Sequence, residues 1–244
     1  MRVAVPLLLC AFATACSGGS KGGGASGQYG GTFTLQNSAS APYAYGYFVS
    51  SAGEFTAPAL DTCLVATTAS QPAPRYLDAG ATLTISGGPA PISLARTGDS
   101  SYLYYSAFPA ASAIPADTSF DVTATGGPDL GAMSLPGVLA VRHAISLGAN
   151  VAVPASADLA LTWAPVGADF IRFDFFNGFS PPALLSCIAK DDGSFAIPAA
   201  ILAALPAGAG NGLITSATVE KTRIVGGRVV VFDGVAEAET IWSK

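Results

Sequence analysis

The chain has 244 residues, of which 50% are hydrophobic and only 11% are charged, and its formal net charge is −5. Its eleven Lys and Arg residues form no cluster, so the composition argues against nucleic acid as a partner. Gly (28) and Pro (17) together make up almost one residue in five, which interrupts the chain too often for long helices and predicts many short strands joined by turns.

The first 15 residues are typical of a bacterial lipoprotein signal peptide. Arg2 gives a positive start, an apolar run follows, and the small residues Ala13-Thr14-Ala15 precede Cys16. The apolar run is too short to span a hydrocarbon core of about 30 Å. We therefore expect cleavage before Cys16 and acylation of Cys16, which would hold the protein firmly at a membrane. The alternative is ordinary secretory cleavage after Ala15, which would leave Cys16 unmodified.

Residues 16–28 are expected to form a lipidated tether rich in Gly and Ser. After Cys16, the sequence SGGSKGGGASGQ has no apolar side chain larger than Ala, so it cannot bury enough surface to fold. Ser17 is not the Asp that often retains lipoproteins in the inner membrane. We therefore expect a lipid anchor in the bacterial outer membrane, and both its periplasmic and its cell-surface side stay open.

The next segment, residues 29–138, is predicted to be an N-terminal β-sandwich. Apolar and polar residues alternate at 32–36, 82–86 and 119–123, which is the period of half-buried strands. Gly87-Gly88-Pro89 favours a tight reversal after the second of these strands.

Residues 139–244 are predicted to be a C-terminal β-sandwich. Alternation places Leu159, Leu161 and Trp163 on one face of a strand, and it continues at 171–175. Asp192-Gly193 and Gly226-Gly227 predict hairpins, and Pro198 opens the one short helix that we expect. The sequence as a whole therefore predicts an all-β protein of two tandem antiparallel β-sandwich domains.

Two resemblances accompany this prediction. With Trp163 on an early strand, a short helical crossover and a closing hairpin, the C-terminal half resembles a fibronectin type III or immunoglobulin-like module. Four longer segments together resemble a set of uncharacterised lipoproteins of myxobacteria and their relatives, over most of the mature chain. The segments are LTISGGPAPISL (83–94), SFDVTATGGPDLGAM (119–133), DLALTWAPVGADFIRFDF (158–175) and CIAKDDGSFAIPAAILAALP (187–206). The second resemblance implies the same architecture and lipidation, and it supplies no activity.

Two cysteines remain after Cys10 leaves with the signal and Cys16 takes lipid. Cys63 and Cys187 would face an oxidising compartment and could form a disulfide that joins the two halves. The alternative is two separate buried thiols, because free Cys is among the most buried residue types.

The sequence offers little catalytic or metal-binding chemistry. His143 is the only histidine, and no G-x-S-x-G motif accompanies it. The stretch 191–194 (DDGS) lacks the ligand spacing of a calcium loop. Glu237 and Glu239 are interpreted as the solvated face of an edge strand. We therefore expect no catalytic residues, no metal, no cofactor and no enzymatic activity.

Tyrosines are the one feature that suggests binding. Tyr43, Tyr45 and Tyr47 alternate on one predicted strand, and Tyr102, Tyr104 and Tyr105 gather further along the chain. Exposed, they would form a platform for sugars or for a protein partner; buried, they would be ordinary core residues. The expected function is a membrane-anchored, non-enzymatic protein-interaction or structural module of the cell envelope. The alternative is a lipoprotein that binds carbohydrate or another surface polymer.

Overall fold

The computed structural model describes residues 27–38, 42–50, 59–65, 74–99, 102–178, 180–208 and 211–244. Its strands are β1 (Tyr29–Ser38), β2 (Tyr43–Ser50), β3 (Thr62–Val65), β4 (Arg75–Leu77), β5 (Thr82–Ser86), β6 (Ile92–Asp99), β7 (Tyr102–Ala107), β8 (Thr118–Ala124), β9 (Met133–Val141), β10 (Asn150–Ala152), β11 (Leu159–Thr162), β12 (Phe170–Asn177), β13 (Ser180–Ala189), β14 (Ser194–Ile197), β15 (Asn211–Val225) and β16 (Arg228–Ser243). The helical elements are a 3-10 turn, η1 (Ala111–Ala113), and the predicted short helix, α1 (Ala199–Leu202). The prediction of an all-β protein is confirmed.

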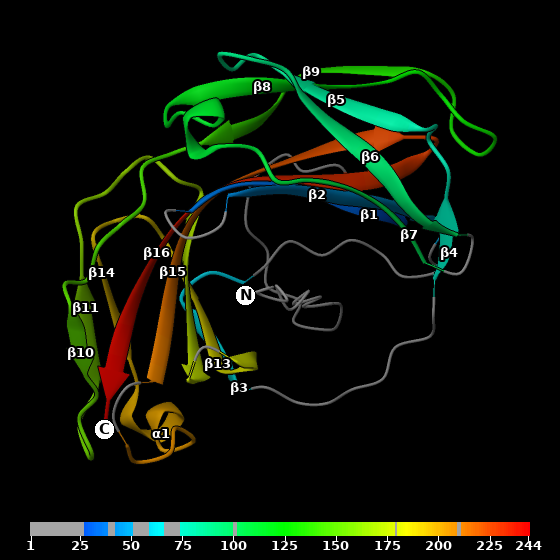
Figure 1. Ribbon diagram of the computed structural model, residues 1–244. Coiled ribbons are helices and arrows are strands. Elements are labelled where there is room, and N and C mark those ends of the chain that lie inside the picture. Colours follow the sequence, from blue (N-terminus) through cyan, green and yellow to red (C-terminus); the bar gives the residue numbers. More distant parts are fainter. Residues whose placement is uncertain are drawn as a thin grey trace.

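Fourteen strands form one large sheet (Figure 1). Its order is β3-β13-β12-β15-β16-β1-β2-β7-β6-β5-β8-β9, with β10 beside β16 and β4 beside β2, and β11 and β14 make a separate two-stranded sheet. Most neighbours are antiparallel, as expected. However, β1 and β10 pair in parallel with β16, so the sheet is mixed and the expectation of purely antiparallel pairing is wrong at these two places. Hairpins dictate antiparallel pairing only for consecutive strands, whereas β1 and β10 reach β16 from distant parts of the chain.

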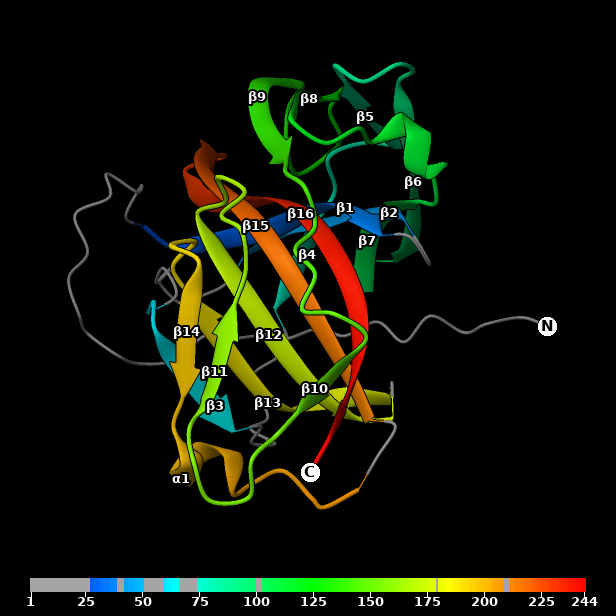
Figure 2. The same ribbon diagram turned by 90° about the vertical axis from the view of Figure 1, so that its left-hand side faces the viewer.

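The longest hairpin, formed by β15 and β16, runs through both halves of the molecule (Figures 1 and 2). Its register is unbroken, and Gly226 and Gly227 make the turn with φ of 56° and 77°. Positive φ at both central residues is what a two-residue hairpin turn requires, so this predicted hairpin is confirmed. The reversal at Gly87-Gly88-Pro89 is confirmed as well, because it joins β5 to β6.

The Asp192-Gly193 turn has a different role from the one predicted. It carries the chain from β13 to β14, but β14 pairs with β11 and β13 pairs with β12 and β3. The turn therefore leads from the large sheet to the small one, and it does not close a hydrogen-bonded hairpin. A turn sequence fixes the local reversal of the chain and leaves the pairing partner open.

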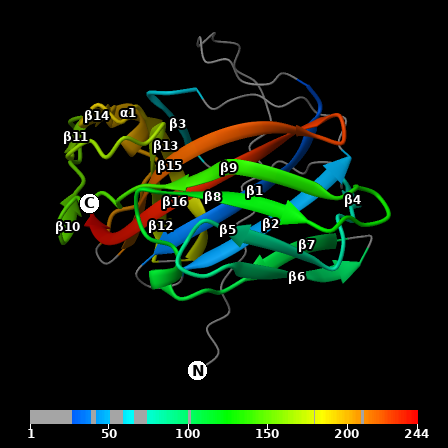
Figure 3. The ribbon, with the colours of Figure 1, turned by 90° about the horizontal axis from the view of Figure 1, so that it is seen from above.

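The large sheet is bent and has two different faces. On its outer face, β5, β6, β8 and β9 lie over one half of the arch, and β11, β14 and α1 lie over the other half (Figures 1 to 3). Strand alternation assigns side chains to the two faces. In β12, Ile171, Phe173 and Phe175 are fully buried on the outer face, whereas Arg172 and Asp174 belong to the inner face.

Two hydrophobic cores lie beneath the outer face. The first draws mainly on residues 29–138 and includes Phe33 and Phe120, and the second draws mainly on residues 139–244 and includes Trp163. The hairpin contributes to both, because Phe232 belongs to the first core and Trp242, on the same strand, to the second. The cores are thus connected through β16.

The covering layer approaches β16 closely at Gly234. A Cβ at this position would lie 2.0 Å from the carbonyl oxygen of Ala140 in β9, so only glycine allows the two strands to cross there. The approach brings β9, from the middle of the chain, directly onto β16.

Cys63 and Cys187 form a disulfide, with an S–S distance of 2.06 Å. Cys63 on β3 lies directly opposite Cys187 on the neighbouring strand β13. Of the two alternatives that the sequence left open, the structure shows the bridge. It ties a strand of the N-terminal half to the sheet of the C-terminal half.

The predicted signal peptide (1–15), Cys16 and the tether up to residue 26 lie outside the described residues. Within the described part of the chain, the single short α-helix is far below the length needed to cross a bilayer.

Candidate functional site

The inner face of the large sheet collects aromatic and charged side chains from consecutive strands. Thr34 of β1 pairs with Tyr45 of β2 on one side and with Asp233 of β16 on the other. Across β15 and β12, the same face continues through Ser216 to Arg172. Because side chains alternate along each strand, these residues share one face. The inner face is therefore the strongest candidate for a binding site.

Six tyrosines form a continuous group on this face, which we call the tyrosine cluster. Its members come from β1, β2, β4 and β7, and they are Tyr29, Tyr45, Tyr47, Tyr76, Tyr102 and Tyr104. Five of the rings make a closed circuit in which each ring contacts two others, with centroids 5.3 to 6.0 Å apart. The sixth, Tyr29, joins through its hydroxyl, 3.2 Å from that of Tyr47.

Burial keeps four hydroxyls of this cluster protonated. It raises the pKa of Tyr29, Tyr45, Tyr47 and Tyr76 above the usual value of a phenol. The Tyr45 and Tyr102 hydroxyls lie 3.3 Å apart, and this hydrogen bond adds to the rise at Tyr45. The cluster thus combines five half-buried rings and the buried ring of Tyr76 with hydroxyls that can donate and accept hydrogen bonds.

The sequence located part of this cluster. Alternation placed Tyr45 and Tyr47 on one face of β2, and Tyr102 and Tyr104 share a face of β7. The sequence pattern does not indicate that Tyr29 and Tyr76 belong to the cluster. Each is a single tyrosine without a periodic pattern around it, and Tyr76 lies on a strand of only three residues.

Tyr105 does not belong to the predicted surface. Its side chain is fully buried in the first core, on the opposite face of β7 from Tyr104, because neighbouring residues of a strand point to opposite faces. Its hydroxyl accepts a hydrogen bond from the Ala79 backbone N–H at 2.8 Å and donates to the Gly80 carbonyl at 3.0 Å. Burial raises its pKa to about 12. Tyr105 is a structural residue.

Beside the tyrosine cluster, the inner face carries a group of charged residues that we call the acidic cluster. It consists of the carboxyl groups of Asp174, Glu220, Asp233 and Glu237 and the guanidinium of Arg172. Burial raises the pKa of Glu220, Asp233 and Glu237 to about 7, and the positive charge of Arg172 opposes each of these shifts. Burial also raises the pKa of Asp174, again against Arg172.

Tyr43 connects the two clusters. It lies on the same face of β2 as Tyr45, and it pairs with Gln36 of the neighbouring strand β1. Burial raises the pKa of its hydroxyl, and the carboxylates of Glu237 and Asp233 raise it further. Tyr43 therefore faces the acidic cluster.

Hydrogen bonds satisfy some carboxylate oxygens of the acidic cluster and leave one open. Gln36 Nε2 donates to Glu237 Oε2 at 2.5 Å, and Ser216 Oγ donates to Glu237 Oε1 at 3.3 Å. Thr32 donates to the Asp233 carboxylate, but Asp233 Oδ1 is buried and accepts no hydrogen bond from the described residues. An unsatisfied buried acceptor is costly, so this oxygen marks the place where a ligand donor would be most favourable.

The interpretation of Glu237 as a residue of a solvated edge strand is wrong. β16 lies in the middle of the large sheet, between β15 and β1, and Glu237 is half-buried on the inner face. Glu239, two residues further, is exposed. The alternation of Glu237 and Glu239 with Ala is typical of a strand, but it does not show whether that strand is central or at an edge.

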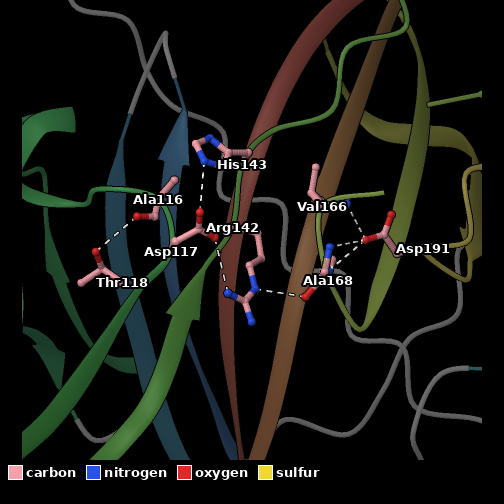
Figure 4. Close-up of polar contacts among 9 residues, drawn as sticks. Ala116, Asp117, Thr118, Arg142, His143, Val166, Ala168 and Asp191 are labelled. Carbon is pink, nitrogen blue, oxygen red and sulfur yellow. Dashed lines mark hydrogen bonds and ion pairs between the residues drawn. The ribbon is translucent and has the colours of Figure 1, made fainter. Parts of the chain in front are cut away.

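Asp191 has a structural role (Figure 4). Its carboxylate accepts hydrogen bonds from the backbone N–H groups of Val166, Gly167 and Ala168, at 2.7 to 2.9 Å. Trp163 Nε1 also donates to it, at 2.8 Å. Four donors saturate its oxygens. The carboxylate thus fixes the loop after β11 against the end of β13, and it is occupied by protein donors rather than offered to a cation.

His143 lies near the predicted boundary between the halves, where it contacts an acidic side chain (Figure 4). Its Nε2 is 3.2 Å from Asp117 Oδ2, and Arg142 reaches the other oxygen of Asp117 at 3.4 Å. The nearby Thr118 hydroxyl donates to the Ala116 carbonyl at 3.3 Å instead of to the imidazole. The histidine is mostly exposed, and its described contacts are those of a surface ion pair.

Among the described residues, neither the hollows of the surface nor the possible metal ligands indicate a second binding site. A shallow hollow of about 300 Å³ runs beside β11 and β14, and another of about 270 Å³ lies beside the turn of the long hairpin. Among the residues that the structure describes, no three His, Cys, Asp or Glu are arranged to hold a metal ion.

No known protein family matches this chain, and no curated protein matches its sequence.

Proposed function

We propose that this protein is a non-enzymatic, lipid-anchored protein of the bacterial outer membrane whose inner sheet face binds a glycan. The observation that carries the proposal is the closed circuit of tyrosine rings on that face, next to buried polar side chains. The anchor would be acylated Cys16 at the end of the tether, as the signal sequence and the resemblance to myxobacterial lipoproteins suggest. No cofactor, metal or nucleic acid takes part in the proposed function.

Tyrosine rings suit a polyhydroxylated ligand in two ways. Their faces pack against the C–H groups of a sugar ring, and their hydroxyls exchange hydrogen bonds with sugar hydroxyls. Neutral, half-buried hydroxyls such as those of Tyr45 and Tyr47 can serve as donor or acceptor, so they adapt to more than one sugar orientation.

The glycan is favoured over a protein partner as the principal ligand. A protein interface usually has an apolar centre. The exposed large apolar side chains of the described residues are spread over separate elements, with Leu64 and Val65 on β3, Phe108 after β7, Ile224 on β15 and Ile241 on β16. The tyrosine cluster is the larger continuous feature.

We also propose that the chain is built as two β-sandwich units, 29–138 and 139–244, each formed by one half of the large sheet and its covering strands. Two separate cores support this division. The fibronectin-like description of the second unit needs one change, because its final strand also belongs to the first core.

The test is glycan binding by the full-length protein, purified in a detergent that has no sugar headgroup. An array identifies ligands, and titration calorimetry measures their affinity. Tyr45→Ala and Tyr104→Ala should each weaken binding roughly tenfold, or about 1.4 kcal/mol. The matched control is Phe108→Ala, which removes an exposed ring outside the cluster and should leave affinity unchanged.

Two outcomes would overturn the proposal. If the wild-type protein binds no glycan, or if the tyrosine variants bind as well as the control, the inner face is not a glycan site. If the bound glycan is cut and Glu237→Gln abolishes the cutting, the protein is an enzyme and the raised carboxyl pKa values belong to its acid–base chemistry.

A further inference from the structure

We propose that the glycan carries protonated amino groups and that the acidic cluster selects them. This inference rests on the glycan binding proposed above and names the class of sugar: an amino-sugar polymer whose amines are free rather than acetylated.

The first argument is the excess of acidic groups on one side of the face. Glu220 and Asp233 lie opposite each other on β15 and β16, and Ser216, next to Glu237, pairs with Arg172 of β12. With Asp174, the cluster holds four carboxyl groups and one guanidinium. The other charges that reach it are also acidic, since Asp169 raises the pKa of Glu220 and Glu239 raises that of Glu237. Glu220, Asp233 and Glu237 have pKa values of about 7, and a bound ammonium group would favour the ionised form of each.

The second argument is the unsatisfied oxygen of Asp233. Its Oδ1 is buried and receives no hydrogen bond from the described residues. An ammonium group brings three donors and a positive charge, whereas a sugar hydroxyl brings one donor and none of the charge. The ammonium is therefore the stronger partner for this carboxylate.

The third argument is continuity with the tyrosine cluster. Asp233 and Tyr45 both pair with Thr34, from opposite sides of β1. Two strand spacings separate them, on the order of 10 Å. Asp233 also raises the pKa of Tyr29 and Tyr47, which shows that its charge reaches the tyrosine cluster. One short oligosaccharide could thus place a ring on the tyrosines and the amine of a neighbouring unit at Asp233.

A metal ion is the less suitable cation. Among the described residues, no three acidic, histidine or cysteine side chains converge with metal-binding geometry. Arg172 lies among the carboxylates and would repel a divalent ion more strongly than a single ammonium.

The experiment compares two tetramers of equal length, one of β-1,4-linked glucosamine and one of β-1,4-linked N-acetylglucosamine, just below neutral pH. The full-length protein should bind the glucosamine tetramer at least tenfold more tightly, and added salt should weaken this preference. Asp233→Asn should abolish the preference for the glucosamine tetramer. Tyr45→Ala should weaken binding of both.

The controls separate selection from folding. Asp192→Asn removes one exposed carboxylate beside the small sheet and keeps a favoured turn sequence, Asn-Gly, so it should retain the preference. Glu220→Gln is a second test within the cluster and should reduce the preference even if Asp233→Asn fails to fold.

The outcomes distinguish this inference from the proposed function. Equal binding of both tetramers, unchanged in Asp233→Asn, overturns the selection of amines and keeps glycan binding. Binding of other glycans on the array but of neither tetramer also overturns it. If no glycan binds at all, the proposed function fails, and the inference fails with it.

Discussion

Removing the Cys63–Cys187 disulfide should lower the stability of the whole protein and not only of the strand that carries Cys63. The perturbation is the double substitution Cys63→Ala and Cys187→Ala, which leaves no single reactive thiol. The bridged residues are 124 positions apart. For a loop of this size, the loss of chain entropy in the unfolded state predicts about 5 kcal/mol of stabilisation at 25 °C.

This magnitude is large compared with the 5 to 15 kcal/mol that stabilises a typical domain. It acts on the global transition because the loop enclosed by the bridge contains β4 to β12 and hence strands of both cores. A local effect should accompany it. In the described chain, β3 is a four-residue strand at the end of the large sheet and pairs only with β13, so without the bridge it should detach first.

Guanidinium unfolding followed by tryptophan fluorescence measures the global effect, because Trp163 and Trp242 are buried in the second core. The midpoint of the double variant should fall well below that of the wild type. A reductant should lower the midpoint of the wild type to that of the double variant, and it should leave the midpoint of the variant unchanged. A loss below about 1 kcal/mol, with the β3 amides still protected from hydrogen exchange, would refute the reasoning from loop entropy.

Three further predictions concern buried polar groups. Tyr105→Phe should destabilise the protein by about 1 to 3 kcal/mol, because it leaves the buried Ala79 N–H without its acceptor; an unchanged thermal midpoint would contradict this role. Asp191→Ala should cost at least about 2 kcal/mol, since four donors lose one ionised acceptor, and Trp163 fluorescence should shift in the folded variant; a fully stable variant would show that water replaces the carboxylate. Stability should fall as the pH rises from about 4 to 7, because Glu220, Asp233 and Glu237 hold their protons to about pH 7 when folded and release them near 4 when unfolded. Guanidinium titrations over this range should show a shallower fall for Asp233→Asn, and stability that rises over the same range in the wild type would exclude the raised pKa values.

The strands that the sequence identified best are those with clean alternation. The segment 82–86 coincides with β5, and the segment 119–123 lies within β8. Alternation also put the β2 tyrosines on one face, because the period of a strand depends only on its own backbone. These features are local, and local chemistry determines them.

What the sequence could not provide were the partners of these strands. Nothing in β1 indicates that it pairs with β16, whose first residue comes about two hundred positions later. For the same reason the sequence does not predict the acidic cluster. Arg172 and Asp174 fit the polar side of one strand, and Glu237 fits the polar side of another strand. Only the order of strands in the sheet brings these residues to one place.

The position of β16 determines when the chain can complete its fold. Phe232 and Trp242 of this strand complete the two cores, and β16 follows every other described element in chain order. A chain that is still being synthesised therefore lacks a part of each core, and long-range pairing such as that of β1 with β16 closes slowly. The polypeptide should therefore stay unfolded until its final strand is available, which would suit the export that the proposed lipid anchor requires.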